Sequence, residues 1–221
     1  MRKLDTILFD LDGTLINTNE IIISSFFASF KRYFPNLGLS REKVMTFIGP
    51  TLHETYGNYT SDPVLIEKLI TAYREYYVKY EMGNFSIYPQ VKEVIKALYA
   101  NGYNLGIVTS KYKVAAWPSF TFYGLEKYFS VFVALDDVTY PKPNKEPILT
   151  ALSHFPSYNK AIMIGDNQGD ILAGKNAGIY SAGVEWSLKG KDHLLEVEPD
   201  FMLSNMKDIY RVIKIINEEA N

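Results

Sequence analysis

Two carboxylates, Asp10 and Asp12, stand one residue apart directly after the apolar run ILF. Burying an unpaired carboxylate is so unfavourable that the group must find a cation or take up a proton. The pair therefore predicts that positive charge is held at the end of this run. Asp166 follows a second apolar run, and Thr109 with Ser110 follows a third. If these runs are parallel strands of one sheet, their polar ends meet at the edge where such sheets bind ligands.

The types of these residues indicate a metal-assisted reaction on a phosphate ester. A cluster of Asp10, Asp12 and Asp166 without histidine or cysteine offers hard oxygen ligands, which suit Mg²⁺. Mg²⁺ keeps several water or phosphate ligands, so the ion and a phosphate group can share the site. Asp10 and Asp12 tend to face the same side of an extended chain, so one can attack while the other transfers a proton.

Smaller residues and one lysine could bind the anionic substrate. Gly13 permits a tight turn that brings backbone N–H groups close to an anion. The hydroxyl groups and amides of Thr109 and Ser110 suit phosphate oxygens. Lys142 stands between two prolines in the stretch TYPKPNKEP, so the loop restricts where its ammonium group can move.

Strands must position these residues, and five short apolar runs have a suitable length and composition. They cover residues 6–10, 104–110, 131–135, 161–166 and 180–184. Their apolar residues do not alternate with polar ones, which is typical of strands buried on both faces of a parallel sheet. Helical patterns occupy residues 89–101, 167–179 and 204–219. The alternation of strands and helices predicts an α/β fold with a doubly wound, Rossmann-like parallel sheet.

The region after the first strand differs, because it shows helical patterns and no buried strand. In residues 17–34, apolar residues recur with helical spacing, and Asn17 or Thr18 can cap the helix. In residues 61–80, Asp62 caps and Pro63 takes the first helical position. We expect an all-helical cap domain, residues 16–85, inserted into an α/β core that comprises residues 1–15 and 86–221.

Aromatic residues are frequent in this insertion. One helical stripe of residues 61–80 comprises Leu65, Leu69, Ala72, Tyr73, Tyr76 and Tyr80. Such stripes pack a core more often than they bind a ligand, so we interpret this one as part of the small core of the cap.

Composition limits the class of protein. The 221 residues are 47% hydrophobic and 22% charged, as in globular proteins of one or two domains. The net charge is −2 and no basic tract exceeds two residues, which argues against nucleic-acid binding. No uncharged apolar stretch approaches the roughly 18 residues of a membrane span. There is no cysteine, which excludes disulfides and thiol chemistry and fits a cytoplasmic location. For the oligomeric state we expect a monomer or a dimer.

Four segments, in this order, resemble the motifs of the haloacid dehalogenase superfamily. They are DLDGT (10–14), VTS (108–110), Lys142 within PKPNKEP, and GDNQGD (165–170). The helical insertion resembles the C1-type cap of that superfamily. The pieces FIGPTLHETY, TSK, LDDV and GVEWS resemble its phosphoglycolate phosphatase-like branch, and within that branch the PpaX-type inorganic pyrophosphatases.

The resemblance implies a role for each matching residue. Asp10 would be the nucleophile that forms an aspartyl-phosphate, and Asp12 would protonate the leaving group and then deprotonate water. Thr109 would hold the transferring phosphoryl group, and Lys142 would neutralise negative charge. Mg²⁺ would be bound by Asp10, the backbone carbonyl of Asp12, and Asp166.

Three further residues are weaker candidates. Asp170 lies one helical turn after Asp166, and the resemblance implies a second metal ligand or a carboxylate that orients the lysine. Gly49 and Pro50, in the loop FIGPT, suit a fixed turn that could reach the leaving group. The alternative for that loop is an ordinary connection between helices.

The leading interpretation is Mg²⁺-dependent hydrolysis of a small anionic phosphorylated substrate, pyrophosphate or phosphoglycolate. A sugar-phosphate phosphatase or a β-phosphoglucomutase-like phosphotransferase shares all four motifs and stays an alternative. Relatives that cleave carbon–halogen or carbon–phosphorus bonds lack the acid found at Asp12, which counts against that chemistry. A non-catalytic binding protein on the same scaffold would lack the nucleophile or a metal ligand, and neither is missing.

Overall fold

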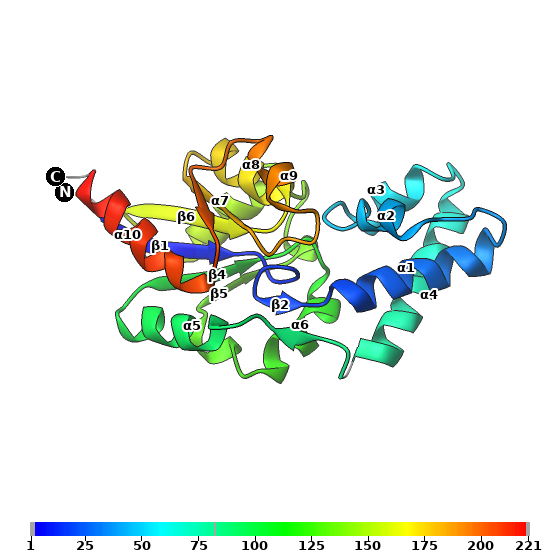
Figure 1. The fold of residues 1–221 in the computed structure, drawn as a ribbon, viewed down its shortest axis with the longest axis horizontal. Coiled ribbons are helices and arrows are strands. Elements are labelled where there is room, and N and C mark those ends of the chain that lie inside the picture. Colours follow the sequence, from blue (N-terminus) through cyan, green and yellow to red (C-terminus); the bar gives the residue numbers. More distant parts are fainter. Residues whose placement is uncertain (1–2, 82, 220–221) are drawn as a thin grey trace. The chain divides into compact units, whose positions relative to one another are not determined.

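A six-stranded parallel sheet forms the centre of the α/β part of the chain (Figure 1). The computed structural model describes residues 3–81 and 83–219. The strand order is β5-β4-β1-β6-β7-β8. The strands are β1 (Leu4–Phe9), β4 (Asn104–Val108), β5 (Val131–Val133), β6 (Lys160–Gly165), β7 (Tyr180–Val184) and β8 (Phe201–Leu203). The predicted doubly wound parallel sheet is confirmed, and β8 is a strand that the sequence pattern did not indicate.

The central strand β1 lies between β4 and β6. Ile7 pairs with Leu105 on one side and with Ile162 on the other, and all three side chains are buried. Continuous burial of this kind explains why these strands appear in the sequence as apolar runs rather than alternating ones.

Helices cover both faces of the sheet, as the alternation of elements predicts. α7 (Glu146–Ser153) and α8 (Gln168–Asn176) lie on one face, and α5 (Val91–Ala100) and α10 (Ile209–Glu218) lie on the other (Figure 1). The remaining helical segments of this part are α6 (Lys113–Phe122), α9 (Lys191–Leu195), η1 (Glu126–Tyr128), η2 (Leu135–Asp137) and η3 (Met206–Asp208), the last three being 3₁₀ turns.

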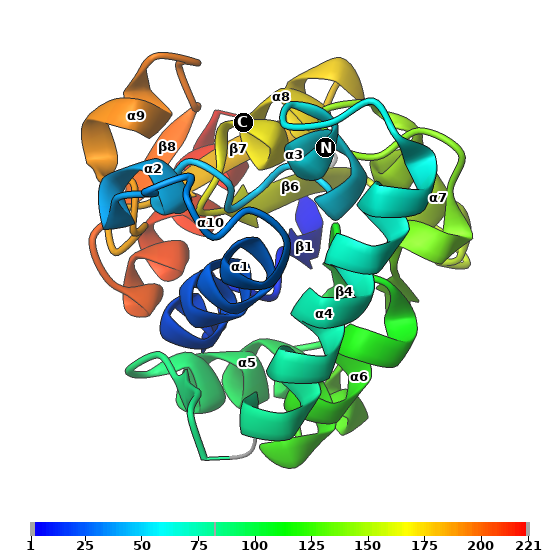
Figure 2. The same ribbon diagram turned by 90° about the vertical axis from the view of Figure 1, so that its right-hand side faces the viewer.

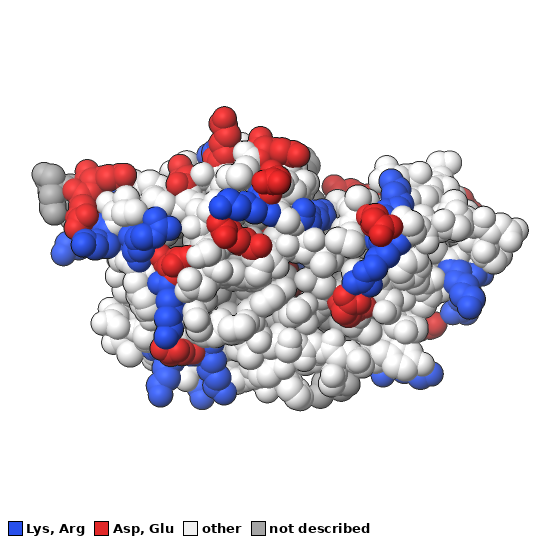
Figure 3. Space-filling view, viewed as in Figure 1, with Lys and Arg blue, Asp and Glu red and all other residues white. Residues whose placement is uncertain are grey.

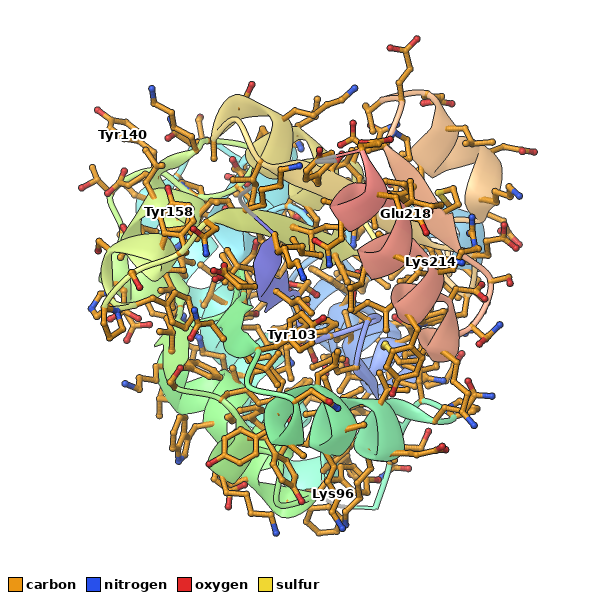
Figure 4. All side chains as sticks on the ribbon, turned by 90° about the vertical axis from the view of Figure 1, so that its left-hand side faces the viewer. Lys96, Tyr103, Tyr140, Tyr158, Lys214 and Glu218 are labelled. Carbon is orange, nitrogen blue, oxygen red and sulfur yellow. The ribbon has the colours of Figure 1, made fainter. Side chains whose placement is uncertain are left out.

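The C-terminal helix α10 is amphipathic, with one apolar face that is buried and one charged face that is exposed. Val212 and Ile216 are buried on its inner side. Lys214 and Glu218 point away from the sheet (Figure 4), and their charged atoms lie 3.7 Å apart. An exposed pair at this spacing contributes little to stability, so the buried apolar face is what attaches the helix.

The chain divides into two compact units, one running to Ile16 and resuming at Ile87, the other spanning Asn17–Ser86. Short strands β2 (Ile16–Asn17) and β3 (Ser86–Ile87) pair where the chain passes between the units. The second unit is helical, and in it α1 packs beside α4 while α3 packs against α4 (Figure 2). Its helices are α1 (Asn19–Tyr33), α2 (Arg41–Met45), α3 (Leu52–Gly57) and α4 (Pro63–Glu81).

The ends of these helices follow the sequence signals with one exception. Asp62 Oδ1 accepts a hydrogen bond of 2.9 Å from the Val64 amide, and Pro63 is the first residue of α4, as predicted. Thr51 and Glu54 form a reciprocal capping box on α3. Of the two residues predicted to cap α1, Thr18 occupies the N-cap position without a side-chain capping hydrogen bond, whereas Asn17 Oδ1 accepts from the Asn19 amide at 3.4 Å.

Aromatic side chains form the core of the helical unit. Phe26 lies 5.8 Å from Tyr56 and 4.8 Å from Tyr73, measured between ring centroids. The predicted stripe on α4 was partly wrong, because Tyr77 is buried and stacks on Tyr73, whereas Tyr80 is 40% exposed. The orientation of α4 against α1 selects the face that includes Tyr77.

A buried hydrogen bond joins α1 to α3 inside this core. The Ser29 hydroxyl donates to the Phe26 carbonyl at 2.9 Å, so in the 2.6 Å contact with Tyr56 the tyrosine hydroxyl is the donor. Burial raises the pKa of Tyr56, which keeps its hydroxyl protonated.

The surface carries mixed charge. On the face seen in Figure 3, lysine and arginine side chains lie among aspartate and glutamate side chains. Exposed ion pairs such as Lys207 with Glu93, 3.0 Å apart, reflect this mixture. Within residues 3–81 and 83–219, no helix has both the length and the apolar composition that crossing a membrane requires.

Candidate active site

The carboxyl ends of adjacent strands carry the predicted site residues. Asp10 follows β1, and its amide donates to the Ile164 carbonyl of β6 at 2.9 Å. Thr109 follows β4, and its amide donates to the Val133 carbonyl of β5, also at 2.9 Å. Asp166 directly follows β6. The sheet ladder thus continues through the first residue after β1 and after β4, which fixes the backbone of the site at Asp10 and Thr109.

Three carboxylates meet at this edge. Asp10, Asp166 and Asp170 are each buried, and one oxygen from each lies within 4.8 Å of the others. Asp170 comes from the first turn of α8, where one of its oxygens accepts a hydrogen bond of 3.0 Å from the Asn167 amide. The other oxygen of Asp170 faces the lysine of the site.

Lys142 is a buried cation in direct contact with this cluster. Its Nζ donates to Asp10 Oδ1 at 2.7 Å, to Asp170 Oδ1 at 2.5 Å and to the Val108 carbonyl at 2.8 Å. An ammonium group has three N–H donors, so these protein oxygens engage every one of them. Lys142 therefore neutralises and orients the two carboxylates from a fixed position.

Burial and neighbouring charges shift the pKa values of the clustered side chains. Burial raises the pKa of Asp10 from 3.8 to about 7; Lys142 opposes this rise, and the charge of Asp170 adds to it. Burial likewise raises the pKa of Asp166 well above its usual value, reinforced by Asp10 and Asp170. Burial would lower the pKa of Lys142, but attraction to Asp10 and Asp170 outweighs it and leaves that pKa raised.

The donor set fits a divalent cation. All three clustered carboxylates offer oxygen, the ligand type that Mg²⁺ prefers, and the described residues of the cluster include no thiolate or imidazole. Burial raises the pKa values of Asp10 and Asp166 even though Lys142, and for Asp166 also Lys189, oppose the rise. A bound cation would supply the missing positive charge.

Two glycines make room for the carboxylates. Gly13 has φ of +84°, and a Cβ atom there would lie 2.3 Å from Asp166 Oδ2. A Cβ atom on Gly165 would lie 2.3 Å from Asp170 Oδ2. The Gly13 amide donates to the Ile16 carbonyl at 2.8 Å, so this glycine serves the site through its backbone conformation and lack of a side chain.

Asp12 faces a second lysine, not the clustered carboxylates. Lys111 Nζ lies 2.8 Å from Asp12 Oδ1, and the two side chains are 18% and 12% exposed. The Lys111 amide donates to Thr109 Oγ1 at 3.2 Å. Because the Thr109 oxygen accepts this hydrogen bond, its own O–H can donate to a phosphate oxygen.

The loop after β7 holds the backbone of the site through hydrogen bonds to Asp166 and Thr14. Ser187 Oγ donates to the Asp166 carbonyl at 2.7 Å in a buried contact. Trp186 Nε1 donates to the Thr14 carbonyl at 3.2 Å, beside the turn that follows Asp12. The indole also packs against Tyr88, with 5.8 Å between the two ring centroids.

Most predicted residues come together in the α/β unit. Asp10, Asp12, Thr109, Lys142, Asp166 and Asp170 surround the strand ends, and Ser110 lies half-buried beside Thr109. Gly49 and Pro50 lie in the other unit, exposed in the loop between α2 and α3. Substrate binding by Gly13, Ser110, Gly49 and Pro50 stays a prediction.

Sequence reasoning overlooked Lys111, Trp186 and Ser187 as members of the site. All three follow strands of the same sheet, Lys111 after β4 and the other two after β7. The rule that picked out Thr109, a polar residue at the end of an apolar run, would have found Lys111 and Ser187 if applied to every strand.

Residues 7–184 match the family model described as haloacid dehalogenase-like hydrolase. The chain is a haloacid dehalogenase-like hydrolase. A pyrophosphatase PpaX from Bacillus cereus is 42% identical over 216 residues, which is 97% of this chain and 99% of that protein. A pyrophosphatase PpaX from Listeria innocua is 44% identical, over 96% of this chain and 97% of its own.

Solved structures agree with this family assignment. The crystal structure of a predicted phosphoglycolate phosphatase from Haemophilus somnus superposes with a TM-score of 0.84 at 27% identity. The alignment covers 96% of this chain and 99% of that one. The resemblance found in the motifs is thus confirmed for the haloacid dehalogenase-like fold and for hydrolase chemistry.

Proposed function

We propose that this hydrolase is a Mg²⁺-dependent inorganic pyrophosphatase that works through an aspartyl-phosphate on Asp10. The observation that carries the proposal is the buried cluster of Asp10, Asp166 and Asp170 around Lys142, with Asp12 beside it. Pyrophosphate is preferred over phosphoglycolate because the PpaX relatives match almost the full length of the chain.

In the first step the Asp10 carboxylate attacks a phosphorus atom of the substrate. A bond forms between an Asp10 oxygen and phosphorus, while the bond from phosphorus to the leaving-group oxygen breaks. The electron pair of that bond stays on the leaving oxygen, which receives a proton from Asp12. Lys142 offsets the repulsion between the anionic nucleophile and the anionic phosphoryl group.

In the second step Asp12 takes a proton from a water molecule. The water oxygen bonds to phosphorus, the bond to Asp10 breaks, and Asp10 regains its carboxylate while inorganic phosphate leaves. The same group acts first as acid and then as base. Thr109 suits the task of holding the phosphoryl oxygens, since its amide is tied to β5 and its hydroxyl oxygen to Lys111.

The carboxylates of Asp10, Asp166 and Asp170 would hold Mg²⁺, together with the backbone carbonyl of Asp12 that the family resemblance implies. When bound there, the ion polarises phosphoryl oxygens and stabilises the charge that develops on them. The Ser187 contact to the Asp166 carbonyl would keep that residue in place.

A phosphate-release assay tests the proposal. Pyrophosphate, phosphoglycolate, hexose phosphates and nucleotides are compared with Mg²⁺ and with excess EDTA. We expect pyrophosphate to have the highest kcat/KM and EDTA to abolish release. Faster release from a hexose phosphate, or isomerisation of it, would favour the sugar-phosphate phosphatase or phosphotransferase alternative. Activity that is unaffected by EDTA would reject the metal requirement.

The Asp10→Asn variant tests the nucleophile. The amide cannot form an acyl phosphate, so turnover should fall to the limit of detection while the fold is kept. Asp192→Asn, at an exposed position on α9, is the matched control and should keep wild-type activity. Near-normal hydrolysis by Asp10→Asn would reject the proposed intermediate.

A cytoplasmic location stays a prediction, which cell fractionation would check.

A further inference from the structure

We propose that Lys111 binds the negative charge of the leaving group and so selects substrates whose leaving group is itself an anion, such as the distal phosphoryl group of a diphosphate. This inference rests on the proposed function, because it places the leaving group beside Asp12. It goes beyond that function by assigning substrate selectivity to a lysine of the α/β unit.

The position of Lys111 is the first argument. Its Nζ lies 2.8 Å from Asp12 Oδ1. Asp12 can protonate the leaving-group oxygen only from within hydrogen-bond distance of it, about 2.6 to 3.2 Å. Whatever is attached to that oxygen must therefore lie close to the Lys111 ammonium. In a diphosphate, the attached atom is a phosphorus atom that carries further anionic oxygens.

The contrast with Lys142 is the second argument. Lys142 has 4% of its side chain exposed and directs all three donors to Asp10, Asp170 and the Val108 carbonyl. It cannot bind a substrate oxygen without giving up one of these contacts. Lys111 is more exposed, at 18% of its side chain. The side chain of Lys111 is therefore more accessible than that of Lys142 to a substrate that lies beside Asp12.

The backbone of Lys111 is fixed from both sides, which is the third argument. Its amide donates to Thr109 Oγ1 at 3.2 Å, and its carbonyl accepts from the Leu135 amide at 2.9 Å. The next turn is held as well, because the Lys113 amide donates to Asp136 Oδ1 at 2.8 Å. A lysine on an anchored backbone keeps its ammonium in one region of the site, as selective binding requires.

Charge distribution agrees with this assignment. Asp10, Asp166 and Asp170 with Lys142 form the side that holds the transferring phosphoryl group, while Asp12 and Lys111 form a separate ion pair. A neutral leaving group would gain nothing from a partly buried ammonium. An anionic leaving group gains a charge-assisted hydrogen bond, the strong class of such bonds.

The test compares Lys111→Met with wild type and with Lys113→Met. Lys113 is exposed, and its ammonium lies 5.6 Å from the Trp117 ring centroid, so it is a nearby lysine that makes no contact with Asp12. Each protein is assayed with pyrophosphate, whose leaving group is anionic, and with p-nitrophenyl phosphate, whose leaving group carries no charged substituent.

We expect Lys111→Met to lower kcat/KM for pyrophosphate by about 10-fold to 100-fold, largely through KM, since a hydrogen bond to a charged group is lost. Hydrolysis of p-nitrophenyl phosphate should fall by a factor at least about threefold smaller, because it loses only the support that Lys111 gives Asp12 and no contact with an anionic leaving group. Lys111→Arg, which keeps the charge, should recover part of the loss, and Lys113→Met should match wild type with both substrates. Equal losses with both substrates, or no loss with pyrophosphate, would overturn the inference.

A binding measurement separates this inference from the proposed function. Methylenediphosphonate is a diphosphate analogue that cannot be hydrolysed, and methylphosphonate lacks its second anionic group. Calorimetry with Mg²⁺ should show that Lys111→Met weakens binding of the diphosphonate about 10-fold or more and leaves methylphosphonate binding unchanged. A wild-type protein that releases no phosphate rejects the proposed function, whereas a diphosphonate affinity that is unchanged in the variant rejects the role of Lys111.

Discussion

The ammonium of Lys142 lies 2.7 Å from Asp10 Oδ1, although 132 positions separate the two residues in the sequence. Both side chains are more than nine-tenths buried. A buried lysine can stay charged only when anionic partners compensate its desolvation, and here Asp10 and Asp170 do so. The contact therefore links the nucleophile to its neutralising charge before any substrate arrives.

Replacing Lys142 by methionine should impair both catalysis and stability. We expect kcat to fall by about 10²-fold to 10³-fold, because the charge that offsets repulsion between nucleophile and phosphate is lost. The free energy of unfolding in EDTA should fall by roughly 3 kcal/mol, since Asp10 and Asp170 remain buried without their partner. Steady-state assays and urea denaturation measure the two effects.

Lys145→Met is the matched control for that experiment. Lys145 belongs to the same loop but is exposed, so its removal should leave kcat and unfolding nearly unchanged. If Lys142→Met retained wild-type kcat, the neutralising role of Lys142 would be wrong.

Magnesium affinity should rise as pH rises from about 6 to about 8. Burial raises the pKa of Asp10 to about 7 in the metal-free protein, so below that pH a proton competes with the ion for this carboxylate. Binding should release protons, and fewer at the higher pH. Calorimetric titrations in two buffers of different ionisation enthalpy measure this release, and Asp10→Asn should show less of it.

The same pKa has a defined effect on the stability of the metal-free protein. Because the native state holds the Asp10 proton more tightly than the unfolded chain, its contribution favours folding below about pH 4 and is lost as pH rises to about 7. The difference in unfolding free energy between wild type and Asp10→Asn should change in that window. A difference that stayed constant from pH 4 to pH 8 would show that Asp10 titrates normally.

Gly13→Ala should lower the magnesium affinity of the site in addition to lowering the free energy of unfolding. The new methyl carbon would lie 2.3 Å from Asp166 Oδ2, so the carboxylate has to move. Gly102→Ala is a control for backbone strain, because Gly102 has a similar φ of +80° and a Cβ atom there meets nothing within 4 Å. Gly102→Ala should lose about 1 kcal/mol of stability, and Gly13→Ala should lose at least as much because Asp166 also has to move.

Only Gly13→Ala should lose magnesium affinity, by about tenfold or more, as measured by calorimetry. Equal affinities in the two alanine variants would mean that Asp166 does not need the space beside Gly13.

The sequence was sufficient to locate most of the buried strands and the polar residues that meet at their ends. Strands such as β1 and β6 are buried on both faces, so their composition is mainly apolar and the polar residues that follow them stand out. β8 has only the residues Phe201–Leu203 and lies at the edge of the sheet, where a short apolar run has no distinctive pattern.

Features that depend on packing between elements were less predictable. Both Tyr73 with Tyr77 and Tyr76 with Tyr80 follow helical spacing on α4, and only contact with α1 buries the first pair. Lys111 was overlooked for a related reason. A lysine after a strand is usually solvated, and its partner Asp12 is 99 positions away.

Ser187→Ala should affect the metal site through the Asp166 backbone. The Ser187 hydroxyl donates to the Asp166 carbonyl at 2.7 Å, and its loss should lower stability by about 1 kcal/mol and magnesium affinity by about 10-fold. Ser153→Ala removes a similar hydrogen bond, 2.8 Å to the Thr150 carbonyl, at an exposed position. This control should keep wild-type affinity. If both variants bound magnesium as wild type does, the loop after β7 would support the fold and not the metal ligand, because a weakened support for Asp166 must appear in the affinity.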